Sequence, residues 1–267
     1  MIKRIIKLQL QKAGLYEYVK YSFPFQIWER IFKPLVQKRN KKEITFYLSF
    51  LPQCNIIFDI GAYDGHKTAA FLTISKRIVS IEPDTFNYRA LQIRFRNKTK
   101  RVFIENKAIS SECGEKQFYI NHPGSAFNTL NKKWVAVLEN DNIEKWDVKI
   151  KFAAQPVIVS VITLDTLVLK YGRPDFIKID TEGHEEEVLK GLTQKIPFLS
   201  FECLLPDFRN ELNNCLKEID RIDDTALFNI AQDEKLLFSN FISTAQLKNW
   251  VNTANIYHFE IVVKMNL

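Results

Sequence analysis

The sequence predicts an α/β fold in which helices cover both faces of a mainly parallel sheet. From residue 55 onward, short apolar runs alternate with segments of helical pattern. Continuous apolar strands that alternate with helices are typical of such sheets. The apolar runs read NIIFDI, RIVSIE, VFIENKAI, VIVSVI, FIKID, FLSFECLL, LFNIA and IYHFEIVV. The helical segments read HKTAAFL, FNYRALQIRFRN, LDTLVLKYG, EEEVLKGL and DFRNELNNCLKEID.

This alternation also predicts where a ligand binds. Right-handed crossovers bring the carboxyl ends of parallel strands to one edge of the sheet. Ligands of such sheets bind at that edge, near the point where the strand order reverses. We expect residues 51–267 to form this domain, with an irregular insertion at 111–156 on the substrate side. Residues 1–50 are expected to form a helical N-terminal extension.

The N-terminal extension carries the basic character of the chain. Residues 1–42 hold 11 Lys or Arg against two acids, whereas the remainder holds 27 bases against 29 acids. A nearly neutral core argues against nucleic acid as a partner. Ile2, Ile5, Ile6 and Ala13 share one helical face. Such a helix packs on the core with its basic side in solvent, which we favour, or it contacts the inner face of a membrane peripherally.

Composition predicts a cytoplasmic protein with reduced thiols. No run of 18 apolar residues occurs, and the first residues lack the pattern of a signal peptide. The cysteines, at 54, 113, 203 and 215, are scattered and predict neither a disulfide frame nor a zinc site. The oligomeric state stays open.

The segment IIFDIGAYDG, residues 56–65, predicts the first part of the ligand site. A strand ends here, and Gly61 and Gly65 bracket the turn before a helix. Glycine allows a close approach of backbone to ligand. Two of the three glycines of a dinucleotide-binding G-x-G-x-x-G turn are absent, and Asp59 and Asp64 would repel a pyrophosphate. The turn suits a cationic ligand without phosphate, such as S-adenosylmethionine.

The next two strands supply further candidates. The strand in RIVSIEPD ends at Glu82, 23 residues after Asp59, and an acid at this place can accept both ribose hydroxyls. Asn106 follows the third strand, where the adenine edge is expected. It either bonds adenine or is a turn asparagine, and both interpretations stay open.

A dense polar cluster follows in FIKIDTEGHEEEVLKGL. Asp180 and Glu182 are candidates for chemistry at the strand end. His184 is either a general base or an ordinary first-turn helix residue. Glu185 fits a helix N-terminus. Carboxylates and an imidazole can hold a divalent metal, but the spacing does not demand one, so we predict none.

Together, DIGAYDG, IEPD, NKAIS, the LDTL helix and IKIDTEGHEEEVLKG resemble the FkbM-type family of S-adenosylmethionine-dependent class I methyltransferases, over roughly residues 55–205. The resemblance implies a Rossmann-like fold with a mostly parallel seven-stranded sheet. It also implies O-methylation of a sugar hydroxyl, in polysaccharide biosynthesis or on a glycolipid or glycosylated metabolite.

The resemblance also assigns residues. Those implied at the methionine end are Asp59, Gly61, Ala62 and Gly65, and Glu82 is implied at the ribose. Asp180, Glu182 and Gly183 are implied beside the transferred methyl group. Tyr63 and Pro83 lie in the same motifs and are counted with the cofactor-binding residues. The base that takes the acceptor proton is Asp180 or His184.

Three alternatives compete with this interpretation. An NAD-dependent oxidoreductase would need the missing glycines. A nucleic-acid methyltransferase of the base-amine type would carry an Asn/Asp-Pro-Pro-aromatic tetrapeptide where this chain reads DTEG, and no Pro-Cys pair occurs for cytosine chemistry. The third is a non-catalytic module that binds S-adenosylmethionine or a membrane.

Aromatic residues punctuate the 111–156 insertion, at Phe127, Trp134, Trp146 and Phe152. They either stack on a sugar ring or form the insertion's own small core, and the sequence does not separate these two.

Overall fold

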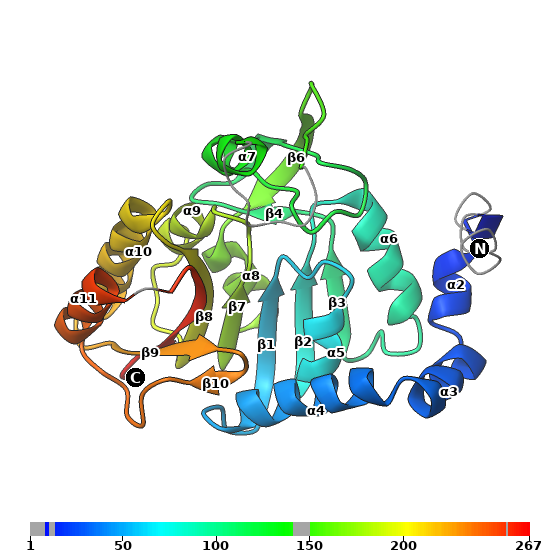
Figure 1. Cartoon of the computed structure of the whole chain (residues 1–267), viewed down its shortest axis with the longest axis horizontal. Coiled ribbons are helices and arrows are strands. Elements are labelled where there is room, and N and C mark those ends of the chain that lie inside the picture. Colours follow the sequence, from blue (N-terminus) through cyan, green and yellow to red (C-terminus); the bar gives the residue numbers. More distant parts are fainter. Residues whose placement is uncertain (1–8, 11–13, 141–149, 255) are drawn as a thin grey trace.

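A computed structural model describes residues 9–10, 14–140, 150–254 and 256–267 of the chain. It shows one large sheet between two layers of helices (Figure 1). The strands of this sheet follow the order β10-β9-β11-β8-β7-β1-β2-β3. Their bounds are β1 Cys54–Ile60, β2 Ser75–Ile81, β3 Val102–Glu105, β7 Phe176–Ile179, β8 Phe198–Leu204, β9 Leu227–Gln232, β10 Lys235–Leu236 and β11 His258–Lys264.

The centre of the sheet is parallel, which confirms the predicted fold class. The pairs β1–β2, β2–β3, β1–β7 and β7–β8 are parallel, and β11 runs antiparallel between β8 and β9. Seven of these strands give the predicted sheet, and the two-residue strand β10 adds a short hairpin at its edge. The strand order reverses between β1 and β7, and the carboxyl ends of β1, β2 and β7 meet there (Figure 1).

The helices lie mostly in the predicted places, although two of them, α7 in the insertion that was expected to be irregular and α11 near the end of the chain, were not predicted. Their bounds are α2 Tyr16–Lys20, α3 Phe23–Phe32, α4 Pro34–Leu48, α5 His66–Phe71, α6 Thr85–Arg94, α7 Lys132–Glu139, α8 Leu164–Tyr171, α9 Glu185–Lys190, α10 Arg209–Ile222 and α11 Thr244–Thr253. In the described part of the chain, no helix is both long enough and apolar enough to cross a bilayer. The four cysteines, all within described residues, are free thiols.

One predicted strand lies elsewhere. The run VIVSVI was expected in the main sheet, but it forms β6 (Val157–Ile162) of a separate three-stranded sheet with β4 (Ala108–Ile109) and β5 (Gly114–Phe118). Only Val161 and Ile162 of this strand are buried, while Val157 and Ile158 face solvent. A continuous apolar run therefore does not by itself indicate a strand buried on both faces.

The helical extension joins the domain through α4. Phe46 and Tyr47 at the end of α4 are buried against Phe71 of α5 and Phe176 of β7. By contrast, α2 and α3 bury no residue and lie beyond the sheet edge (Figure 1). The predicted apolar face of Ile2, Ile5, Ile6 and Ala13 lies outside the described residues.

The insertion has a small core of its own. Trp134 and Phe152 are buried together with Leu204 and Phe208 from the end of β8 and the start of α10, and Phe127 packs against this cluster. Of the two interpretations of these aromatic residues, the insertion's own small core is the one that Trp134 and Phe152 fit. Trp146 lies outside the described residues.

Candidate functional site

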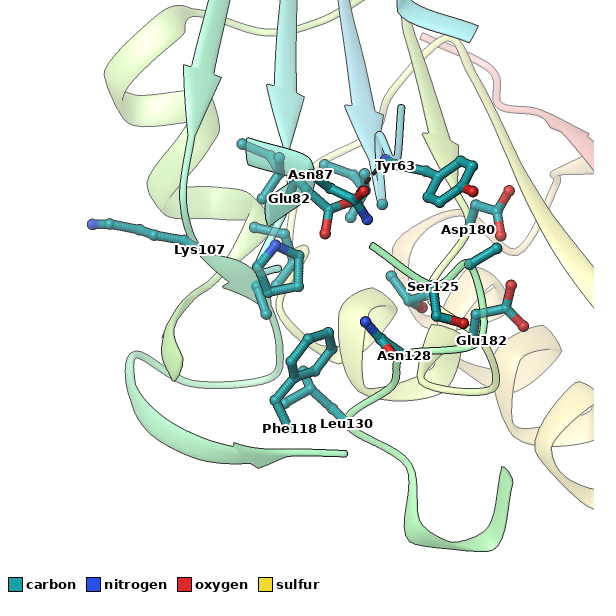
Figure 2. Close-up of a pocket in the computed structure, with 18 residues that line it drawn as sticks. Tyr63, Glu82, Asn87, Lys107, Phe118, Ser125, Asn128, Leu130, Asp180 and Glu182 are labelled. Carbon is teal, nitrogen blue, oxygen red and sulfur yellow. Dashed lines mark hydrogen bonds between the residues drawn. The ribbon is translucent and has the colours of Figure 1, made fainter. Parts of the chain in front are cut away.

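A cavity of about 130 Å³ lies at the carboxyl edge of the sheet, where the strand order reverses. Six predicted residues line it: Gly61, Tyr63, Glu82, Pro83, Asp180 and Glu182. Figure 2 shows Asp180 and Glu182 on one side of this cavity, with Glu82 and Asn87 nearer its middle and the Lys107 side chain pointing away on the other side. The cavity therefore runs along the tips of three strands, as the sequence predicts for the ligand.

Gly61 is required by the close approach of two strand ends. Its φ is +78°, and a Cβ atom there would lie 1.8 Å from the carbonyl oxygen of Asp180. Gly65 also has a positive φ of +78°, and a Cβ there would meet Leu91 at 2.6 Å and Phe95 at 2.7 Å. The two glycines thus let the turn press against β7 on one side and α6 on the other. Gly65 does not line the cavity.

Tyr63 and Glu182 both line the cavity with backbone in the left-handed region. Their φ angles are 50° and 55°. Such conformations are uncommon for residues other than glycine and cost of order 1 kcal/mol or more. They occur here at both turns that border the cavity.

Asp59 lies beneath the cavity and does not line it. Its buried carboxyl accepts a hydrogen bond from the Thr68 hydroxyl, which also bonds Ser80 at 2.9 Å. Burial raises the pKa of Asp59 to about 6. Asp59 therefore links β1 to α5 and β2. Ala62 is likewise buried, and its carbonyl accepts the Gly65 N–H at 2.8 Å.

Glu82 is a buried carboxyl at the cavity wall. Its Oε2 accepts the backbone N–H of Tyr63 at 2.8 Å, and its Oε1 accepts that of Asp84 at 2.9 Å. Burial raises the pKa of Glu82 to about 8, although these hydrogen bonds act in the opposite direction. A carboxylate has about four acceptor positions, so each oxygen can accept one more hydrogen bond.

Asn106 supports the same turn from behind. Its side-chain amide donates to the carbonyl oxygens of Glu82 at 2.9 Å and Pro83 at 3.0 Å. It does not line the cavity. Of its two open interpretations, this geometry favours the turn asparagine.

Asp180 ends β7 above a buried ammonium group that the sequence analysis did not single out. The Lys178 side chain is fully buried, and its Nζ lies 3.4 Å from both Asp180 Oδ2 and Glu202 Oε1. Glu202 also meets His258, with 3.0 Å between Oε2 and Nε2. A lysine between isoleucines in a buried apolar strand needs counter-charges nearby. The sequence FIKID therefore contained a signal for this charge network.

The ionisable groups in this network shift the pKa values of one another. Burial and the nearby Glu202 raise the pKa of Asp180 and Lys178 lowers it, with a net result of about 7. Burial also opposes ionisation of Glu202, but Lys178 and the hydrogen bond from His258 outweigh it and lower its pKa. The hydrogen bond to Glu202 raises the pKa of His258. Asp180 is therefore poised to change protonation near neutral pH.

The turn after Asp180 is held by Glu185. Its Oε1 accepts the backbone N–H and the hydroxyl of Thr181, both at 2.9 Å, and the N–H of Gly183 at 3.4 Å. This fixes Glu182 at the cavity wall, where burial raises its pKa well above the usual range.

His184 faces away from the cavity. Its Nε2 lies 3.2 Å from Ser110 Oγ, and burial lowers the pKa of the ring to about 4. Of the three residues predicted to be catalytic, only Asp180 and Glu182 line the cavity.

A loop of the insertion covers the cavity. Asp84 Oδ2, after β2, accepts the Gly124 N–H at 2.8 Å and the Asn128 side-chain amide at 2.7 Å. On the other side, Thr129 Oγ1 donates to the Glu182 carbonyl at 2.8 Å, and the Asn131 amide donates to the Gly183 carbonyl. The loop thus bridges both turns and brings Ser125, Asn128 and Leu130 to the lining, within the insertion that was expected on the substrate side.

A second, narrow cavity of about 20 Å³ shares the walls formed by Asp180 and Glu182. Glu202, Glu211 and Trp134 also line it, and Trp134 Nε1 has no hydrogen-bond partner among the described residues. This side of Asp180 is strongly acidic. In the described residues, no group of three His, Cys, Asp or Glu side chains is arranged to hold a metal ion.

Comparisons with known proteins agree with these features. The family model of the methyltransferase FkbM domain matches residues 59–220 and confirms the resemblance. An rRNA adenine N-6-methyltransferase from Escherichia coli is 25% identical over 101 residues, which cover 38% of this chain and 37% of that protein.

Two solved structures match this chain in part. A methyltransferase FkbM from Methylobacillus flagellatus has 15% identity and a TM-score of 0.48, covering 80% of this chain and 44% of that one. A TehB-like SAM-dependent methyltransferase from Corynebacterium glutamicum has 10% identity and a TM-score of 0.41, covering 84% and 88%. The chain spans less than half of the length of the E. coli and M. flagellatus proteins.

Proposed function

The chain belongs to the FkbM methyltransferase family, and we propose that it transfers a methyl group from S-adenosylmethionine to a sugar hydroxyl of a glycan, glycolipid or glycosylated metabolite. The observation that carries the proposal is the cavity with Glu82 on its wall and Asp180 and Glu182 on one side, inside the matched segment. The four free cysteines support a cytoplasmic location for this activity.

The cavity residues fit this cofactor. Gly61 lets the turn at the cavity pack against Asp180, whose carbonyl oxygen a Cβ would meet at 1.8 Å, and Glu82 keeps acceptor capacity for ribose hydroxyls beside the backbone N–H groups that fix it. Tyr63 and Pro83 complete this wall. Asp59, Ala62, Gly65 and Asn106 act on the cofactor through the turns they hold, because none of them lines the cavity.

S-Adenosylmethionine, when bound, supplies a methyl group on a positively charged sulfur. The chain must then align the acceptor and take its proton. We assign the proton to Asp180, which lines the cavity and has a pKa of about 7. Lys178 acts as a positioning residue that keeps Asp180 ionised.

The acidic surroundings favour an uncharged, hydroxyl-bearing acceptor. Glu182, Glu202 and Glu211 border the narrow cavity beside Asp180. Among the described residues that line this cavity or form ion pairs with its lining, Lys178 is the only fully buried cation. Phosphate groups would be repelled there. This supports a sugar and disfavours nucleic acid, the substrate named for the E. coli relative.

Calorimetry and turnover assays test the proposal. We expect S-adenosylmethionine and S-adenosylhomocysteine to bind, and NAD not to bind. Asp180→Asn should change cofactor affinity little while reducing methyl transfer to sugar acceptors by about 10²–10⁴-fold. Binding of NAD alone would favour the oxidoreductase instead. Cofactor binding without transfer to any acceptor would favour the non-catalytic alternative.

A further inference from the structure

Helix α3 presents an apolar face that no described part of the chain covers. Phe23, Ile31 and, just beyond the helix, Leu35 are 74%, 63% and 79% exposed. Ile27 and Phe32 are exposed beside them, and α3 contains no buried residue. Exposed apolar patches of this kind mark interaction sites.

The exposed side chains form one continuous stripe. At 100° per residue, the apolar positions of α3 fill a little more than half of the helix circumference, and Gln26, Glu29 and Arg30 fill the rest. The ring centroids of Phe25 and Trp28 lie 5.3 Å apart, and those of Trp28 and Phe32 lie 5.8 Å apart. The stripe is therefore aromatic along much of its length.

Basic side chains surround this stripe. Residues 14–42 contain seven Lys or Arg and two acids, and one of these acids, Glu29, is paired with Lys33 at 2.8 Å. Arg30 on α3, and Lys38 and Lys41 on α4, are exposed to solvent. An apolar stripe with basic neighbours is the pattern of a helix that lies in the plane of an anionic membrane surface.

We propose that α3 and the start of α4 dock this protein on an anionic lipid bilayer. A second copy of the chain would bring the same excess of positive charge against itself, whereas anionic headgroups neutralise it. Helix α3 lies toward the end of the molecule opposite the carboxyl edge of the sheet (Figure 1), and no residue of α3 or α4 lines the cavity, so docking leaves the cavity open. The inference is independent of the proposed acceptor.

The test is flotation of the full chain with phosphatidylcholine vesicles that contain or lack phosphatidylglycerol. We expect binding only to the anionic vesicles and its loss at high salt. The pair Lys38→Gln and Lys41→Gln should weaken binding roughly 25-fold, about fivefold per base. Its matched control is the pair Lys98→Gln and Lys100→Gln, two exposed lysines elsewhere, which should bind normally.

A second variant tests the apolar stripe. The triple change of Phe23, Ile31 and Leu35 to Gln should abolish vesicle binding, whereas Leu169→Gln, which removes an exposed apolar side chain of α8, should not. Absence of binding by the natural chain, or equal binding by all variants, overturns the proposal. A third outcome also overturns it: the natural chain binds no vesicles but forms a dimer, and the triple change dissociates that dimer. A second copy of the chain would then cover the face.

Discussion

The buried ammonium of Lys178 makes a quantitative prediction about the base. Its Nζ lies 3.4 Å from Asp180 Oδ2, and the Lys178 side chain has no solvent exposure. At an effective dielectric constant of about 20, a unit charge pair at this distance is worth about 5 kcal/mol. The ammonium also faces Glu202, and the Asp180 side chain keeps 27% of its exposure, so we take about half of that energy.

Lys178→Met keeps an unbranched side chain that is one atom shorter and removes its charge. Loss of about 2–3 kcal/mol of favourable interaction should move the midpoint of the pH–rate profile up by about one to two pH units. The midpoint moves up because Asp180 must be ionised to accept a proton, and removing a nearby cation makes its ionisation harder. Turnover at pH 7 should fall by roughly tenfold or more and recover in alkaline buffer.

The assay is the pH dependence of kcat, with thermal unfolding measured for each variant. Lys195→Met is the matched control, since Lys195 pairs with Asp223 at 2.9 Å, away from the cavity-lining residues. Its profile should match that of the natural chain. A Lys178→Met profile with an unmoved midpoint, or a folded variant whose activity is lost equally at every pH, would refute the electrostatic argument.

Three further predictions follow from the cavity. Glu82→Gln should weaken S-adenosylmethionine binding about 10–100-fold in calorimetry, since a charged acceptor is lost. In the natural chain, the affinity for S-adenosylmethionine should rise as the pH increases through about 8, because burial raises the pKa of Glu82 to that value and the ionised form binds. Gly61→Ala should lower Tm and abolish turnover through the clash with Asp180, whereas Gly172→Ala, with positive φ but no contact closer than 3.4 Å, should cost about 1–3 kcal/mol of stability from backbone strain and leave turnover of the folded protein unchanged. His184→Gln should leave the pH–rate midpoint unchanged, since the ring faces Ser110; a shifted midpoint would restore His184 as the base.

The sequence predicted those parts of the site that depend on one strand and its following turn. Gly61 and Glu82 were found because apolar periodicity locates the ends of β1 and β2, and parallel strands end at one edge. Which of the predicted residues line the cavity, and which only support the turns around it, was not predictable. Asp59 and Asn106 sit in the right motifs, but whether a side chain points into a cavity or into a turn depends on neighbours such as Thr68.

Features that join distant strands were missed for a physical reason. Lys178, Glu202 and His258 come from β7, β8 and β11. The contact of Lys178 with Glu202 depends on the parallel pairing of β7 with β8, and that of Glu202 with His258 depends on the antiparallel pairing of β11 with β8. Spacing along the chain carries no trace of that pairing. The contacts of the loop over the cavity could not be predicted either, since the side-chain amide of Asn128 is held by Asp84, 44 residues earlier.

The charge balance around Asp180 connects these features. Asp180 and Glu202 lie close to one ammonium, that of Lys178, and burial leaves the carboxyl groups of Asp180 and Glu182 reluctant to ionise until more positive charge arrives. A neutral or anionic ligand would leave that strain in place, whereas a cationic one relieves it. A site with too little positive charge of its own therefore selects a cationic methyl donor, and the same carboxylates are then ionised when a base is needed. The two requirements of the proposed reaction, donor recognition and proton removal, thus rest on one arrangement of charges.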